Sequence, residues 1–133
     1  MSALTNERDT PARDGRRFSD PVGAAKKIFA GSIVVLSATG FAESGTTATG
    51  KIARGRASQT VDNTNGAAGD LAIEIERGCF RFGNDSSITR ANIGATCYIV
   101  DDQTVALTDG SGARSAAGTI RDVDSVGVWV EFT

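Results

Sequence analysis

Two adjacent carboxylates, Asp101 and Asp102, follow an apolar run and lie near a cysteine, a tyrosine and several hydroxyl groups. Paired carboxylates do acid–base chemistry when they come from different elements and one is desolvated, so that their pKa values separate. These two are sequence neighbours between the strand-like segments TCYIV and QTVAL. Aspartates in that position usually form a turn by hydrogen bonding to nearby backbone amides. The pattern therefore predicts a turn, and not a reaction centre.

The remaining residues that could carry chemistry are few and isolated. The chain has no histidine, which removes Ser-His and Cys-His catalysis and the commonest ligand of transition metals. Asp122 and Asp124 have the spacing that opens a calcium loop, but the other ligands of such a loop are missing. The glycine-rich stretches GRASQTVDNTNG and GSGARSAAG lack the Lys-Ser/Thr ending of a phosphate-binding loop. We therefore expect no enzyme, no metal site and no cofactor.

Cys79 and Cys97 lie in strand-like segments and do not form a metal-binding pair. The charged N-terminal segment lacks the apolar core of an export signal. We therefore expect synthesis in a reducing cytoplasm, where free, buried thiols are favoured over a disulfide or a reactive nucleophile. The net charge of -2 provides no basic field that would attract nucleic acid. The longest apolar run, residues 33–36, is far too short to span a membrane.

The composition changes near residue 22. Residues 1–21 are polar and charged and cannot bury enough apolar surface to fold alone. We expect them to form an N-terminal arm, either a flexible tail or a segment that orders on a neighbouring subunit. Residues 22–133 contain short runs of Val, Ile, Thr and Phe separated by Gly, Asn, Asp and Ser, which is typical of an all-β domain. We predict a small, compact β-barrel or sandwich with at most one or two short helical turns, near residues 87–94 and 19–29.

In two of the expected strands, the alternation of side chains predicts which residues face the core. In LAIEIERGCFRF the large apolar residues change parity, and a bulge at Arg77-Gly78 would keep all of them on the core side. These apolar residues are Leu71, Ile73, Ile75, Phe80 and Phe82. In SVGVWVEFT, Trp129 faces outward, and the residues expected to face inward are Val126, Val128, Val130 and Phe132. Gly55, inside KIARGRA, marks a bulge or a close approach of another backbone.

The candidate contact residues lie in the arm and in the last strand. Arg13, Arg16, Arg17 and Phe18 belong to a segment whose acidic residues cancel most of its positive charge. A solvated or subunit-contacting arm is therefore favoured over a phosphate site. A lone exposed tryptophan is uncommon and often anchors an interface. Trp129 is thus a further candidate for an interface contact, and packing against a loop of its own domain is the alternative.

Five segments of the chain, taken in their order and spacing, resemble a known family of proteins. They are AAKKIFAGSIVVLSATGFAES, KIARGRASQTVDN, GCFRF, IGATCYIVDDQTVA and AGTIRDVDSVGVWVEF, and they lie between residues 22 and 132. In this order they resemble a family of small virion proteins encoded among the head genes of tailed bacteriophages, including Mu-like transposable phages and prophages. No single one of these motifs is specific.

The resemblance implies a β-barrel capsid decoration (cement) or minor capsid protein, with no catalytic residues to carry over. Such a protein would be assembled in the host bacterial cytoplasm, bind the major capsid protein on the outside of the phage head, and associate with itself as a trimer. It would contact neither nucleic acid nor membrane. One alternative is a head-completion or tail-tube component. Another is a non-viral cytosolic β-barrel module that binds a small ligand or peptide in a groove lined by Trp129 and Phe80 or Phe82.

Overall fold

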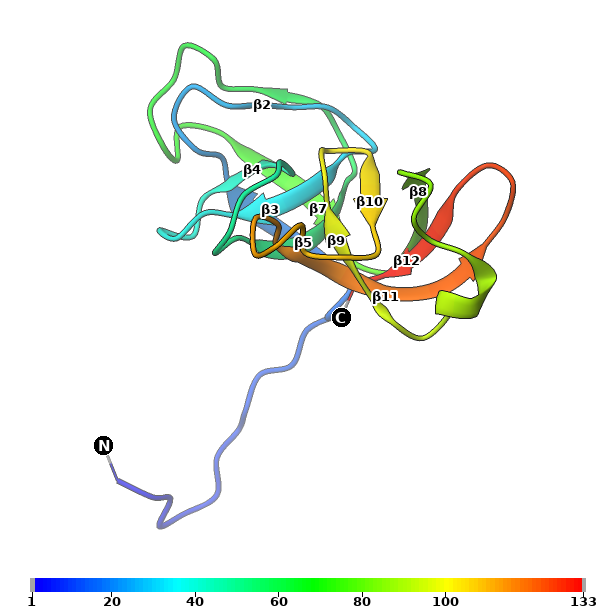
Figure 1. Cartoon of the computed structure of the whole chain (residues 1–133). Helices are drawn as coiled ribbons and strands as arrows, with labels where there is room; N and C mark the ends of the chain where they lie inside the picture. The colour runs from blue at the N-terminus through cyan, green and yellow to red at the C-terminus, as the bar shows by residue number, and fades with distance from the viewer. Residues whose placement is uncertain (1, 133) are drawn as a thin grey trace.

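The computed structural model describes residues 2–132, and this part of the chain has almost no helix. Its strands form a five-stranded antiparallel sheet, a closed five-stranded barrel and a two-stranded ribbon. Figure 1 shows these elements packed into one body, with the N-terminal arm extending away from it. The prediction of an all-β fold with a barrel is confirmed.

The sheet is built from residues 17–76 and the barrel from residues 79–131. In spatial order the sheet consists of β1 (Arg17–Pro21), β7 (Ala72–Glu76), β5 (Ile52–Ala57), β3 (Ile33–Leu36) and β4 (Ala42–Ser44). The barrel closes in the order β10 (Thr104–Ala106), β8 (Cys79–Asn84), β12 (Val128–Glu131), β11 (Ala116–Val123) and β9 (Thr96–Ile99). The ribbon pairs β2 (Lys27–Ile28) with β6 (Val61–Asp62). Within the barrel, β8 and β10 are parallel and the other neighbours are antiparallel.

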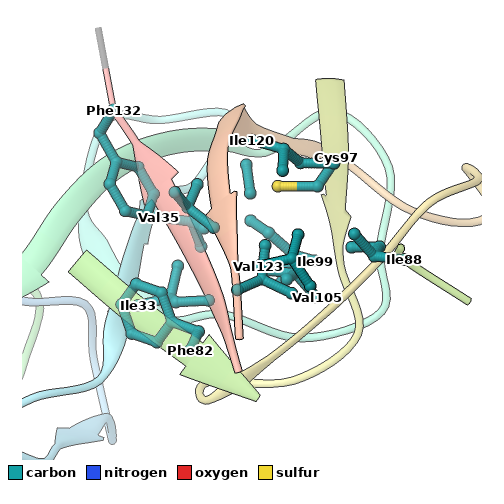
Figure 2. Close-up of a cluster of buried hydrophobic side chains, with 13 residues drawn as sticks. Ile33, Val35, Phe82, Ile88, Cys97, Ile99, Val105, Ile120, Val123 and Phe132 are labelled. Carbon is teal, nitrogen blue, oxygen red and sulfur yellow. The ribbon is translucent and has the colours of Figure 1, made fainter. Parts of the chain in front are cut away.

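Two hydrophobic cores lie on opposite sides of β3, because successive side chains of a strand alternate between its faces. Ile33 and Val35 point into the barrel core, where Figure 2 shows them beside Phe82 and Phe132. Val34 points the other way, into the core between the sheet and the ribbon. β3 therefore joins the two halves of the molecule into one packed body.

β5 makes a bulge where it approaches β7. Its register with β3 slips between Gly55 and Ala53, which leaves Arg54 as the extra residue. Gly55 has a φ of +150°, and a Cβ atom added to it would lie 2.4 Å from the carbonyl oxygen of Glu76. The prediction of a bulge or close approach at Gly55 is confirmed, and only glycine fits this position.

Arg77 and Gly78 link the sheet to the barrel. The predicted bulge at this position is wrong, because β7 ends just before it and β8 begins just after it in the barrel. Ile73 and Ile75 face the core between sheet and ribbon, whereas Phe82 faces the barrel core. The change of parity thus reflects two strands that turn their apolar faces toward different cores.

The N-terminal arm is shorter than the sequence pattern suggested. Residues 17–21 form β1, which pairs with β7 along its whole length. The exposed arm is therefore residues 2–14, which precede a turn at residues 15–16. The expected helical turn near residues 19–29 is wrong, since β1 and β2 take the two ends of that range and residues 22–26 between them contain a turn and no helix. The other expected turn is confirmed as the 3₁₀ helix η1 (Arg90–Asn92), which has Thr89 as its N-cap.

Burial follows the alternation of the strands. The apolar residues expected to face inward are buried or half-buried, except Leu71 and Val126, which lie in bends just outside the strands. Cys97 is buried, as predicted, but the prediction that Cys79 is buried is wrong. Cys79 shares the outward face of β8 with Arg81, so strand parity places its side chain on the surface. Both thiols are free.

In the native protein, one thiol is expected to react quickly and the other slowly. Burial raises the pKa of the Cys97 thiol to about 11, so that its reactive thiolate is scarce at neutral pH. Burial also raises the pKa of Cys79, but this side chain is accessible to reagents. Thiol titration should show one rapid equivalent and a second only after unfolding, and Cys79→Ser should abolish the rapid phase. Two rapid equivalents, or none, would contradict the observed burial.

Candidate functional site

Asp101 and Asp102 occupy the turn between β9 and β10, as predicted. A side-chain oxygen of Asp101 accepts a 2.9 Å hydrogen bond from the backbone N–H of Gln103, which is the pattern of an Asx turn. The carbonyl oxygen of Asp102 accepts a 2.8 Å bond from the N–H of Ile33. The pair therefore helps to hold the barrel against β3. Within residues 2–132, no group of three or more His, Cys, Asp or Glu side chains is placed to hold a metal ion.

Three of the candidate contact residues, Arg16, Arg17 and Phe18, lie together where the arm joins the sheet. Two guanidinium groups approach the Phe18 ring, that of Arg54 at 3.8 Å from the ring centroid and that of Arg77 at 5.4 Å. A guanidinium over an aromatic ring is attracted by the negative face of the ring. This basic and aromatic cluster is called the arm root below. It comprises Arg16, Arg17, Phe18, Arg54, Arg56, Glu76 and Arg77.

Ion pairs fix the arm root to the sheet. Arg54 donates two hydrogen bonds, of 2.7 and 3.1 Å, to the carboxylate of Asp20. Glu76 accepts a 3.2 Å bond from Arg56 and lies 3.6 Å from the guanidinium of Arg16. A bidentate pair between arginine and a carboxylate is strong and directional. β1 is therefore held to β5 and β7 by side chains as well as by its backbone ladder.

Two grooves flank the arm root. The larger has a volume of about 730 Å³, lies over β1, β7 and β5, and is bounded by residues 30–31. The smaller has a volume of about 350 Å³ and joins the arm root to the ends of β8 and β12. Its lining residues are Arg16, Arg77, Gly78, Glu131 and Phe132. The arm thus leaves the body between two concave surfaces.

Trp129 faces outward on β12, as its parity predicts, but it is half-buried and not fully exposed. Its indole N–H donates a 3.1 Å hydrogen bond to Asp124, and the guanidinium of Arg81 lies 5.7 Å from its ring centroid. Arg81 also lies 3.7 Å from the Asp124 carboxylate. Because the three side chains hold one another, Trp129 is a positioned aromatic group on the outer face of the barrel.

The residues expected to line a ligand groove do not line either groove at the arm root. Phe82 is buried in the barrel core, and Phe80 lies beneath the guanidinium of Arg56, which is 4.1 Å from the ring centroid. Trp129 lies on the outer face of the barrel. Arg13, the remaining candidate contact, is exposed in the arm and lies outside the arm root. These three aromatic residues therefore lie in three different settings.

The arm root and Trp129 are connected along the outer face of β8 and β12. The register pairs Trp129 with Arg81 and Glu131 with Cys79, and these four side chains share the outward face of the two strands. They are called the outer stripe below. Glu131 also lines the smaller groove beside Arg16. An aromatic ring, an exposed thiol and charged groups thus form one surface that is continuous with the base of the arm.

Sequence reasoning missed three arginines of the arm root. Arg54 and Arg56 lie on β5, and Arg77 lies in the link after β7, so that only the folded sheet brings them to the arm root. A local signal was present in KIARGRA, where two arginines flank the bulge glycine. Nothing in the local sequence indicates that these side chains lie beside a segment more than thirty residues earlier.

Acid is expected to release Trp129 from Asp124. Hydrogen bonds from the indole N–H, and then from the backbone N–H groups of Val126 and Gly127, lower the pKa of Asp124 below its usual value of 3.8. The folded protein therefore favours the carboxylate, and the contact should be intact above 3.8 and lost as the pH falls through the lowered pKa. Trp129 is the single tryptophan, so its fluorescence reports this step directly.

The measurement is an acid titration of tryptophan fluorescence, with far-UV circular dichroism to verify that the fold persists. The midpoint should lie below 3.8, and Asp124→Asn, which cannot titrate, should remove the transition. A midpoint above 3.8, or the same transition in the variant, would show that another group controls the fluorescence.

The part of the chain from residue 2 to residue 132 has no helix long and apolar enough to cross a membrane. Comparisons with models of protein families, with curated proteins and with solved structures found no match for this chain. Its function is therefore inferred from the arm root, the outer stripe and the order of its sequence segments.

Proposed function

We propose that this protein is a structural virion protein that decorates the outside of the phage head and stabilises contacts between major capsid subunits. The observation that carries the proposal is the geometry of the contact residues. An exposed arm leaves an ion-paired root that is continuous with the outer stripe, which includes Trp129. A packed body with one extended arm can bind two neighbouring subunits at once, as a cement protein must. The resemblance of the sequence segments to small phage virion proteins supports the same role.

The arm provides contact area that can be buried only against a neighbouring subunit. Residues 2–14 are exposed, and fixing a flexible backbone costs about 1–2 kcal/mol per residue. Such a segment therefore orders only where burial against a neighbour offsets that cost. A protein that binds the shell, and not its dissociated subunits, stabilises the shell by mass action.

Self-association as a trimer is part of this proposal. Capsid subunits meet in threes at local threefold axes, and a trimeric partner matches that symmetry. Three copies would present three arm roots and three Trp129 side chains to equivalent capsid surfaces. Multiple attachment makes each complex tighter than any one of its contacts.

Deletion of residues 2–14 tests the role of the arm while leaving β1 in place. The shortened protein should fold, as judged by circular dichroism, because the deleted residues lie outside the strands. Its binding to empty capsids, measured by cosedimentation, should be weaker by about tenfold or more, because one of two linked contacts is lost. Unchanged affinity would indicate that the arm is a tail without a role in binding and that the capsid contact lies on the body.

Cys79 provides a footprint of the bound face. Its thiol is exposed on the outer stripe of the free protein, and capsid binding through that stripe should slow its reaction with a thiol reagent. Cys97, which is buried, is the internal control. Equal labelling of Cys79 in free and capsid-bound protein would place the contact away from the outer stripe.

A further inference from the structure

One edge of the five-stranded sheet is open. β1 pairs with β7 on one side, and the carbonyl oxygen of Arg16 accepts a 2.6 Å hydrogen bond from the N–H of Arg77. Because bonding alternates along an antiparallel pair, the backbone N–H and C=O groups of Arg17 and Ser19 point to the other side. Pro21, which has no N–H, ends this edge. The edge thus offers donors and acceptors to one more short strand.

The larger groove continues from this open edge across one face of the sheet. Its side chains form two rows, Arg17–Glu76–Arg56 and Ser19–Glu74–Ser58. Glu76 is already paired with Arg16 and Arg56, whereas Arg17 is exposed at the edge. A strand added to β1 would therefore meet a positive charge on the groove side.

We infer that the occupant of this edge is the N-terminal arm of a second copy, whose residues 4–10 add to β1 as an extra strand. Strand addition of this kind uses main-chain hydrogen bonds for affinity and alternate side chains for selectivity. Residues 4–10 contain no proline, so every backbone N–H of the segment is able to donate. Pro11 follows directly and limits the added strand at that end.

The side chains of the arm match the two sides of β1. In an extended segment Glu7 and Asp9 share one face, and on the groove side they meet Arg17. Leu4 lies on the opposite face and is 71% exposed in the free arm. On that side the added strand brings it to Phe18, which is half-buried. The arm therefore gains an ion pair on one face and apolar contact on the other.

The arm leads away from the body of its own copy (Figure 1). The N–H of Arg16 donates a 3.0 Å hydrogen bond to the side chain of Asp14, which shapes the turn at the base of the arm. The thirteen residues 2–14 reach up to about 43 Å when extended, enough to cross to a neighbouring copy. Each copy gives one arm and receives one, and the exchange requires no capsid.

Crosslinking between two differently tagged full-length chains tests the exchange. Both chains carry Cys79→Ser, one carries Glu7→Cys in the arm, and the other carries Ser19→Cys at the open edge. Ser125→Cys, at an exposed position in the turn between β11 and β12, replaces Ser19→Cys in the control. A short bis-maleimide should give about tenfold more mixed dimer than in the control, because docking raises the local concentration of the two thiols.

Charge exchange in the same assay tests the pairing of the two segments. Arg17→Glu in the edge chain should lower the yield of mixed dimer, and Asp9→Arg in the arm chain should restore it. Equal yields for Ser19→Cys and the control would overturn the inference. A crosslink that forms only inside a single chain carrying both cysteines would also overturn it. Because the assay contains no capsid, its failure is distinguishable from a failure of capsid binding.

Discussion

Gly55→Ala is expected to destabilise the folded protein by about 3 kcal/mol or more. The added Cβ atom would lie 2.4 Å from the carbonyl oxygen of Glu76, and only a separation of β5 from β7 relieves that overlap. The φ of +150° adds backbone strain that residues with a side chain rarely accept. Because β5 also carries Arg54, the movement would disturb the contacts of the arm root with Asp20.

Gly50→Ala is the matched control for this substitution. Gly50 also has a positive φ, of +73°, but nothing beyond its chain neighbours lies within 4 Å of an added Cβ atom. Its replacement should therefore cost only backbone strain, roughly 1–2 kcal/mol. Urea denaturation of the parent and both variants measures the two losses. Equal losses at the two glycines would contradict a tight approach of β5 to β7.

Trp129→Ala is expected to weaken capsid binding by about 2 kcal/mol or more, roughly a thirtyfold loss of affinity. The indole is already held by Asp124 and Arg81 in the free protein. It therefore loses little conformational freedom when it binds, so that less of the free energy gained from burying the ring is offset by ordering the side chain. The substitution should change the stability of the fold much less, because Trp129 lies outside both hydrophobic cores.

Ile52→Ala is the control for this binding measurement. Ile52 is an apolar residue on β5 with 64% of its surface exposed, and it belongs to neither the arm root nor the outer stripe. Its removal should leave cosedimentation with empty capsids unchanged. Equal losses for Trp129→Ala and Ile52→Ala would indicate a general effect of surface hydrophobicity. If Trp129→Ala bound capsids with wild-type affinity, the outer stripe would not be part of the interface.

Strand alternation is sufficient to predict burial where a strand stays in one sheet. It places Val128, Val130 and Phe132 in the barrel core and Trp129 on the outer face, and both placements are observed. Applied to GCFRF, the same rule places Cys79 on the surface. The wrong prediction for this residue came from the general tendency of cysteine to be buried, which the parity of the strand overrides here.

Strand alternation does not predict the fold where the chain passes from one sheet to another. A bulge and a passage between two sheets both shift the parity of apolar residues by one, so that the pattern around Arg77 and Gly78 is the same in either case. The difference lies in which core each strand faces, and that depends on pairing with β1 and β12, which are distant in sequence. Sequence alone therefore predicted a compact barrel or sandwich, but not the division of the chain between a sheet and a barrel.

The start of the folded region was also beyond local prediction. Residues 17–21 contain Phe18 as their only large apolar side chain, so they carry no strand pattern of their own. Their place in the sheet depends on the ladder with β7 and on the ion pair between Asp20 and Arg54. These partners are far away in the sequence. The same long-range contacts create the arm root, which is why the sequence pointed to Phe18 but not to the arginines around it.

The copy number of this chain in purified virions is the most direct measurement of the proposed role. Quantitative mass spectrometry should find the protein in a fixed ratio to the major capsid protein, because a decoration protein covers the shell. The ratio should hold in particles that lack tails. A copy number no greater than that of a head-completion or tail protein, or absence from the virion, would contradict capsid decoration.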